Sequence, residues 1–164
     1  MLVFAVMVLA IDQVTKYLVS TNLPLGGTWS PLAGSLPLVR IVHAYNTGAA
    51  FGLFQNMNPV FIVVALIIST VIVVYARQVS GDQVLLGTAL GFMLGGSLGN
   101  LLDRLRLGQV LDFIDIGLGT TRWYTSNIAD ASIVFGVILL GLAMLREDRR
   151  AAAVKANGPE VPSA

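Results

Sequence analysis

Four long stretches of mainly apolar residues dominate the pattern of this 164-residue chain. A helix needs about 20 mostly apolar residues to cross roughly 30 Å of hydrocarbon. The four stretches come near this length and cover about residues 1–20, 58–76, 83–102 and 126–145. The second is the cleanest, with Pro59 near its start and Arg77 just after its end. The pattern therefore predicts four transmembrane helices.

The first stretch has the position and hydrophobicity of a secretory signal peptide. It lacks the basic residues that precede the apolar part of such a peptide, and Asp12 and Lys16 stand where a cleavage site would lie. We therefore expect this stretch to be retained as a helix.

The number of spans and the basic residues together predict a topology. An even number of spans places both termini on one side of the membrane. Basic residues favour the cytoplasmic side, and the C-terminal segment contains Arg146, Arg149, Arg150 and Lys155. We expect cytoplasmic termini and external connections at about 21–57 and 103–125. Residues 1–145 then form a single membrane domain, and residues 146–164 form a disordered cytoplasmic tail with little to bury.

The external connections contain two segments typical of short strands. Residues 36–54 and 107–116 are rich in β-branched and aromatic residues and are bounded by glycine and proline. We infer a small sheet-like cap on the outer face. The expected fold class is thus a mainly α membrane protein with four transmembrane helices and a small extracytoplasmic β cap.

Composition agrees with a membrane protein and excludes several functions. Hydrophobic residues make up 55% of the chain and charged residues 12%, whereas soluble domains carry roughly 25% charged residues. The formal net charge of +1 provides no basic surface for nucleic acid. The chain has no cysteine and a single histidine, His43. Disulfides, thiolate nucleophiles and metal sites built on cysteine or on several histidines are therefore excluded.

Small and ionisable residues mark the first and third spans. Glycines recur at every fourth position from residue 87 to residue 99, a spacing that lets a neighbouring helix approach closely. We expect this groove to serve helix packing. Asp12 and Lys16 lie four residues apart, close enough for an ion pair that either neutralises the helix end or supports a site. Asn100, Asp103 and Arg104 lie together at the outer end of the third span.

Two carboxylates near the outer face are the strongest candidates for chemistry. Asp130 falls at the start of the fourth span. The stabilising free energy of its interaction with the helix dipole there would be smaller than the free-energy cost of placing a carboxylate in the membrane. A partner acid precedes Asp130 in V-L-D-F-I-D-I, where strand geometry would turn Asp112 and Asp115 to opposite faces, so that only one of the two can face the same site as Asp130. Two carboxylates in one site share a proton, so one can activate water while the other polarises a carbonyl. This pair predicts aspartic-protease chemistry.

Other functions use the candidate residues less completely. A Ser-His-Asp triad would need His43, which no nucleophile motif adjoins, and we expect His43 to make a polar contact in the cap. A Ser-Lys pair would need Lys16, which faces Asp12. A small transporter or proton relay would use the acids as protonation sites, yet no span is broken at mid-depth and the acids cluster at the outer ends. A purely structural membrane subunit would leave the acids unexplained.

Four sequence boxes together resemble lipoprotein signal peptidase, also called signal peptidase II. In chain order they are D-x-x-T-K from Asp12 to Lys16, N-T-G-A-A-F-G from Asn46 to Gly52, G-G-S-L-G-N-L-L-D-R from Gly95 to Arg104 running on to V-L-D-F-I-D, and S-N-I-A-D-A-S-I from Ser126 to Ile133. One box alone is weak evidence, but the four in this order are highly specific. The resemblance covers about residues 10–145.

The resemblance implies an aspartic peptidase of the bacterial inner (cytoplasmic) membrane, with four helices, a periplasmic β-cradle and an active site near the outer leaflet. Asp112 and Asp130 would be the catalytic dyad. The polar residues around substrate and dyad would be Asn46, Asn100, Arg104 and Asn127, and the supporting positions would be Asp12, Lys16, Gly48 and Asp103.

The same resemblance implies the partners. The substrates would be prolipoproteins with a lipobox whose cysteine already carries diacylglycerol, and cleavage would fall on the N-terminal side of that cysteine. Membrane lipids and globomycin-like peptide inhibitors are also implied, and neither a metal nor another cofactor is needed. The sequence departs from the family at Ser126, where Phe is usual, so that Trp123 or Tyr124 could supply the aromatic side chain near Asn127. It also lacks the basic lead that often precedes the first span.

Overall fold

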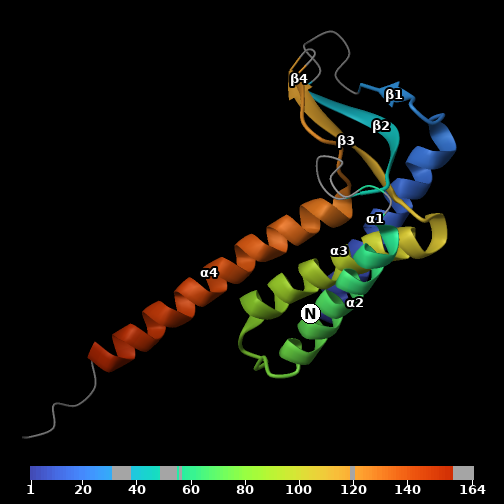
Figure 1. Ribbon diagram of the computed structural model, residues 1–164. Helices are drawn as coiled ribbons and strands as arrows, with labels where there is room; N and C mark the ends of the chain where they lie inside the picture. Colours follow the sequence, from blue (N-terminus) through green and yellow to red (C-terminus); the bar gives the residue numbers. More distant parts are fainter. Residues whose placement is uncertain (31–37, 49–54, 56, 119–120, 157–164) are drawn as a thin grey trace, which may run out of the picture.

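The computed structural model describes residues 1–30, 38–48, 55, 57–118 and 121–156. Within these ranges the elements are α1 (Leu2–Asn22), β1 (Thr28–Trp29), β2 (Val39–Asn46), α2 (Asn58–Ala76), α3 (Val84–Leu107), β3 (Val110–Leu118), β4 (Thr121–Arg122) and α4 (Ile128–Ala156). Each of the four helices is long and apolar enough to cross a membrane, which confirms the predicted spans. The sheet lies at one end of the helices (Figure 1).

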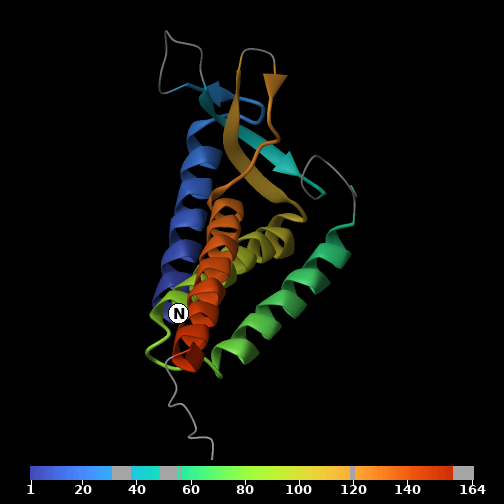
Figure 2. The ribbon, with the colours of Figure 1, turned by 90° about the vertical axis from the view of Figure 1, so that its left-hand side faces the viewer.

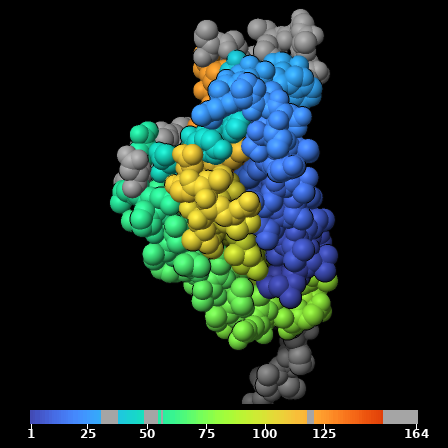
Figure 3. Space-filling model, turned by 90° about the vertical axis from the view of Figure 1, so that its right-hand side faces the viewer, coloured from blue at the N-terminus to red at the C-terminus, as the bar shows by residue number. Residues whose placement is uncertain are grey.

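α3 is the central helix of the bundle. Of the residues in its most apolar window, 61% are buried, against 11% in α2. α3 packs against α1, α2 and α4, and Figure 3 shows its last turns between α1 and α2. The surrounding helices direct apolar side chains such as Ile67 and Val71 outward. This arrangement fits a bundle whose outer surface faces lipid.

The glycines of α3 allow α1 to pack closely against it. A Cβ atom at Gly95 would lie 2.7 Å from the carbonyl oxygen of Ala5, and one at Gly99 would lie 2.7 Å from Oδ2 of Asp12. Both distances are too short for a real contact. At Gly87, by contrast, the nearest atom would be 3.9 Å away. The predicted packing role is therefore confirmed for the middle and end of the groove and is not required at Gly87.

Two helices run beyond their predicted ends. α3 continues past residue 102 to Leu107 and stops at Gly108, whose φ of 72° is left-handed. α4 begins at Ile128 and continues to Ala156. The predicted disorder of the tail is therefore wrong for residues 146–156, because its R-E-D-R-R-A-A-A sequence has high helix propensity and extends a helix that is already formed. Residues 157–164 lie outside the described part of the chain.

The cap is an antiparallel sheet with the strand order β1-β2-β3-β4. The register of its central pair opposes Ala44 to Asp112 and Asn46 to Val110. β2 contains one extra residue between Ile41 and Ala44, a β-bulge, so β3 is the regular strand of the pair. The strands predicted within residues 36–54 and 107–116 are confirmed at residues 39–46 and 110–116. Residues 36, 37 and 49–54 lie outside the described residues, and the two-residue strands β1 and β4 were not predicted.

The sheet packs on the helices through one face of β3. Leu111 and Phe113 are buried with Val19 of α1 in a small apolar cluster. His43 makes the predicted polar contact in the cap, with Nδ1 2.8 Å from the carbonyl oxygen of Leu23. Figure 2 shows the start of α1 and the end of α4 at the end of the bundle opposite the sheet.

Candidate active site

Asp112 lies on β3, on the face turned away from α1. Because its neighbours Leu111 and Phe113 face the apolar cluster with α1, the alternation of a strand turns Asp112 to the other side. Only 1% of Asp112 is exposed. Its Oδ2 accepts a hydrogen bond of 3.0 Å from Nδ2 of Asn46 on the adjacent strand. The strand thus presents a buried carboxyl group toward α3 and α4.

Asp130 is fixed in the first turn of α4 by a reciprocal pair of hydrogen bonds. Oδ1 of Asn127 accepts from the backbone N–H of Asp130 at 3.0 Å, and Oδ2 of Asp130 accepts from the backbone N–H of Asn127 at 3.3 Å. This is a capping box, with Asn127 as the N-cap. Asp12 of α1 adds a third bond, accepting the N–H of Ala129 at 2.9 Å. The hydrogen bonds at the start of α4 therefore hold the Asp130 carboxylate in a fixed position.

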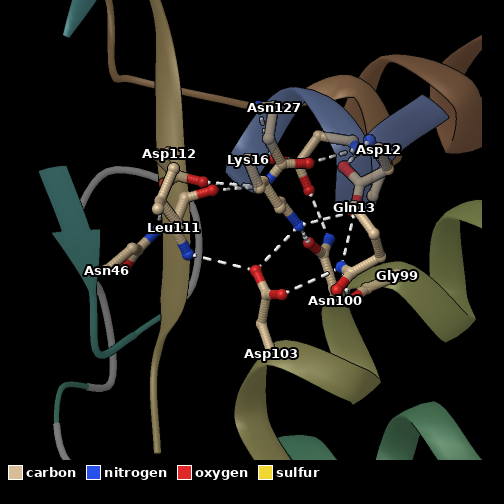
Figure 4. A network of polar contacts seen from close by, with 12 residues as sticks. Asp12, Gln13, Lys16, Asn46, Gly99, Asn100, Asp103, Leu111, Asp112 and Asn127 are labelled. Carbon is tan, nitrogen blue, oxygen red and sulfur yellow. Dashed lines mark hydrogen bonds and ion pairs between the residues drawn. The ribbon is translucent and has the colours of Figure 1, made fainter. Parts of the chain in front are cut away.

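Asparagine side chains orient both acids, and Figure 4 shows Asn46 and Asn127 near Asp112. Nδ2 of Asn127 donates to Oδ1 of Asp112 at 2.8 Å. Nδ2 of Asn100 donates to Oδ1 of Asp130 at 2.7 Å, and Oδ1 of Asn100 accepts from Nδ2 of Asn127 at 3.1 Å. Asn127 therefore contacts Asp112 through its side chain and Asp130 through its backbone. One residue joins the two acids.

A buried ion cluster lies behind Asn100. Nζ of Lys16 is 2.8 Å from Oδ2 of Asp12 and 2.8 Å from Oδ2 of Asp103. It also donates to Oδ1 of Asn100 at 3.3 Å. Asp103 in turn accepts the N–H of Leu111 at 3.2 Å, which fixes the strand residue just before Asp112. The predicted ion pair is thus confirmed, and its contacts lead into the site rather than only neutralising a helix end.

The environment of Asp112 makes it an unusual acid. Burial, followed by the negative charge of Asp130, raises the pKa of Asp112 to about 7. Hydrogen bonds from Asn46 and Asn127 and the positive charge of Lys16 act in the opposite direction. A free aspartate has a pKa of about 3.9. Asp112 can therefore carry a proton near neutral pH, as an acid–base catalyst requires.

A cavity of about 200 Å³ opens beside the two acids. It is lined by Asn46, Gly48, Asn100, Arg104, Val110, Asp112, Tyr124, Asp130, Ile133 and Val134. Nη2 of Arg104 donates to the carbonyl oxygen of Gly48 at 3.3 Å, and its guanidinium lies 5.0 Å from the centre of the Phe61 ring. Six predicted site residues thus line the cavity. The other four, Asn127, Asp12, Lys16 and Asp103, support it from behind.

Asp115, the other acid of the V-L-D-F-I-D box, has a separate environment. It is bound by two arginines, with Nη2 of Arg40 2.5 Å from Oδ2 and Nε of Arg122 2.9 Å from Oδ1. Burial alone raises the pKa of Asp115, but the hydrogen bonds and charges of Arg122 and Arg40 outweigh burial and hold the pKa below its usual range. Asp115 therefore links three strands of the cap as an ionised group.

The structure adds two residues that the sequence did not single out. Nε2 of Gln13 lies 3.0 Å from Oδ1 of Asp103 and 3.2 Å from Oδ2 of Asp12, within the ion cluster. Its position three residues before Lys16, on the same face of the helix, could have indicated this contact from the sequence. Tyr124 lines the cavity, and the sequence offered it only as one possible aromatic neighbour of the site.

Comparisons with known proteins agree with this architecture. The sequence matches the family model of signal peptidase (SPase) II over residues 4–146. A lipoprotein signal peptidase from Moorella thermoacetica is 43% identical over 139 residues, which cover 85% of this chain and 88% of that protein. One from Geobacter metallireducens is 40% identical over 145 residues, which cover 87% and 88%.

Two solved structures share the fold, both of bacterial membrane enzymes determined by the in meso method. The first, at 2.3 Å resolution, has a TM-score of 0.79 and 29% identity, and the match covers 99% of this chain and 93% of that one. The second, at 1.9 Å resolution, has a TM-score of 0.76 and 32% identity, with coverage of 87% and 90%. With its four apolar helices, its antiparallel cap and a family match over most of its length, this chain belongs to the signal peptidase II family.

Proposed function

We propose that this peptidase is a membrane aspartic endopeptidase that removes the signal peptide from prolipoproteins whose lipobox cysteine carries diacylglycerol. Cleavage falls on the N-terminal side of that cysteine. The observation that carries the proposal is the pair Asp112 and Asp130, which line one cavity and are joined through Asn127. The name of the relatives, lipoprotein signal peptidase, supports the substrate class.

The chemistry follows from two acids that share one proton. The ionised carboxylate takes a proton from a water molecule as the water oxygen adds to the carbonyl carbon of the scissile bond. The protonated acid gives its proton to the carbonyl oxygen. In the second step the tetrahedral intermediate returns a hydroxyl proton to one carboxylate while the other acid protonates the leaving nitrogen, and the C–N bond breaks. The products are a signal peptide with a new carboxylate and a protein with a free cysteine amine.

The surrounding amides keep the dyad ready for this reaction. Each oxygen of Asp112 and of Asp130 accepts one N–H bond, so both carboxyl groups are oriented before substrate binds. Such preorganised dipoles stabilise charge that develops in the transition state without further rearrangement. The positive charge of Lys16, held behind Asn100, favours the single negative charge that the pair retains.

We further propose that the sheet faces the outside of the bacterial inner membrane and that both termini are cytoplasmic. The positions of the helix ends support this orientation, since α1 begins and α4 ends at the end of the bundle opposite the sheet (Figure 2). The basic residues Arg146 and Arg149 lie in the last part of α4, and basic residues favour the cytoplasmic side. The cavity then lies near the outer leaflet. A substrate anchored by its lipid can reach it by diffusion in the plane of the membrane.

The cavity also suits the proposed partners. Ile133 and Val134 of α4 line it beside Asp130, so that an apolar wall from a spanning helix adjoins the polar dyad. A peptide segment can lie against the acids while membrane lipid, or the lipid of the substrate, contacts the apolar side. Globomycin-like peptides are expected to compete for the same cavity. The dyad supplies both proton-transfer groups from its own side chains, so no cofactor is invoked.

The test uses the full chain purified in detergent and a lipobox peptide with a diacylglyceryl cysteine. Mass spectrometry should find one cut, directly before the modified cysteine, and the same peptide without lipid should be cleaved much more slowly. The Asp112→Asn protein serves as the control for contaminating proteases and should give no product. Absence of cleavage by the wild-type protein, or a cut at another bond, would refute the proposed function.

A further inference from the structure

A second and larger cavity lies between the end of α1 and the cap (Figure 2). Its volume is about 620 Å³, against about 200 Å³ for the cavity beside the dyad. We call it the α1–cap groove, and its walls are formed by Thr15, Leu18, Val19, Asn22, Leu23, Trp29, Ile41 and Phe113. Because Phe113 and Asp112 are neighbours on β3, the alternation of the strand places the groove and the dyad on opposite faces of the sheet.

The α1–cap groove lies at the depth of membrane hydrocarbon. Its helical wall runs from Thr15 to Asn22, at the end of the span that α1 forms. At a rise of 1.5 Å per residue this wall is about 10 Å long, and one leaflet contributes roughly 15 Å of hydrocarbon. Val14 and Leu18, next to the groove on α1, are exposed. The groove is therefore continuous with the lipid-facing surface of the bundle, in the leaflet nearest the cap.

The lining of the groove favours an apolar occupant. Val19 and Phe113 are buried apolar residues on its walls. The two polar side chains from α1 donate within their own helix, Thr15 to the carbonyl oxygen of Ile11 at 2.8 Å and Asn22 to that of Leu18 at 2.7 Å. A water molecule in a cavity needs two to four polar partners, and a peptide backbone at this depth needs partners for its own polar groups. A hydrocarbon chain needs none.

We propose that the α1–cap groove binds one acyl chain of a membrane phospholipid. At roughly 30 Å³ for a group the size of a water molecule, the groove holds about 20 such groups, which is the size of a single fatty acyl chain. Trp29 is exposed at its edge, as tryptophan side chains are at a membrane interface. The chain belongs to a phospholipid and not to the substrate, because the substrate's lipid is attached beside the scissile bond, on the other face of β3.

The test uses Trp29 as a fluorescent reporter. The chain has two tryptophans, so Trp123→Phe leaves Trp29 alone. In vesicles of phosphatidylcholine whose oleoyl double bonds carry added bromine, which quenches tryptophan on contact, Trp29 should lose more than half of the fluorescence that it shows in unbrominated vesicles. Adding Thr15→Phe, which places a ring in the groove, should restore most of this loss. Val14→Phe, a matched change on an exposed part of α1 outside the groove, should restore none.

The outcomes decide the proposal without any cleavage of substrate. Unquenched Trp29, or equal quenching with and without Thr15→Phe, would overturn it. If Thr15→Phe lowers the melting temperature, the smaller change Thr15→Leu takes its place. A final arm adds a tryptophan-free lipobox peptide with an unbrominated diacylglyceryl cysteine to the protein that also carries Asp112→Asn. Quenching should stay the same. Relief of quenching would assign the groove to the substrate's lipid and overturn the proposal.

Discussion

Replacing Lys16 by methionine tests how strongly the buried ion cluster supports the bundle. Methionine keeps a long unbranched side chain and removes the charge. Oδ2 of Asp12 and Oδ2 of Asp103 would each lose an ion pair of 2.8 Å, and these side chains are only 0% and 5% exposed. Gln13 would remain as a neutral donor to both acids. Two carboxylates would then stand in a buried site without a counter-ion.

The expected loss is large because both partners are out of water. Removal of one member of a buried ion pair costs about 3–5 kcal/mol. For a chain of this size, at about 2–4 °C per kcal/mol, this corresponds to a fall in melting temperature of roughly 6–20 °C. A triple variant, with Asp12→Asn and Asp103→Asn added to Lys16→Met, should recover most of that loss, since an uncharged cluster of the same shape leaves no buried charge.

Thermal melting in detergent measures both changes. Arg77→Met is the matched control, because Arg77 is exposed at the end of α2 and such surface changes stay within about 0.5 kcal/mol. The reasoning fails if Lys16→Met melts within about 2 °C of wild type. It also fails if the triple variant is no more stable than the single one.

Three further predictions concern packing, the cap and topology. Gly95→Leu should sharply reduce the yield of folded protein, whereas Gly87→Leu should reduce it far less, because a Cβ atom at Gly87 would make only an ordinary contact of 3.9 Å with the backbone nitrogen of Met1; size-exclusion profiles after purification compare them. Asp115→Asn should lower the melting temperature at neutral pH. Because the folded-state pKa of Asp115 is depressed, the difference in melting temperature between wild type and variant should be largest above about pH 4. It should disappear as pH falls through the folded-state pKa. In this cysteine-free chain, an impermeant thiol reagent on intact cells should label Gln55→Cys and not Gln78→Cys; the reverse pattern would invert the topology.

The elements that hydrophobic pattern alone determines could be predicted from the sequence. The span of α2 agrees with its predicted range at both ends, because an uninterrupted apolar stretch has one favourable place in a bilayer. The opposite orientation of Asp112 and Asp115 also follows from local geometry, since β3 is regular. The sequence boxes then indicated which polar residues to expect together.

Contacts made by packing could not be read from the sequence. Nothing near Asp12 in the chain indicates that it accepts the N–H of Ala129, 117 residues away. The double role of Asn127, as helix cap and as link between the acids, depends on how β3 meets α4. The same holds for Gln13 and Tyr124, whose types are unremarkable until the helices and sheet bring them to the site. Local helix propensity was underestimated at the ends of α3 and α4, which continue to Leu107 and Ala156.

The most direct test of the dyad is the initial rate of cleavage of a diacylglyceryl lipobox peptide by Asp112→Asn, Asp130→Asn, the double variant and Asp115→Asn, each shown to be folded by melting. Asparagine keeps the shape of each acid but cannot exchange the shared proton. We predict that either single dyad variant loses roughly 1000-fold in rate, and that the double variant is no slower than the singles because the two acids act as one unit. Asp115→Asn should retain most of the activity. Near-normal cleavage by Asp112→Asn or Asp130→Asn, or a folded but inactive Asp115→Asn protein, would contradict the assignment of the dyad.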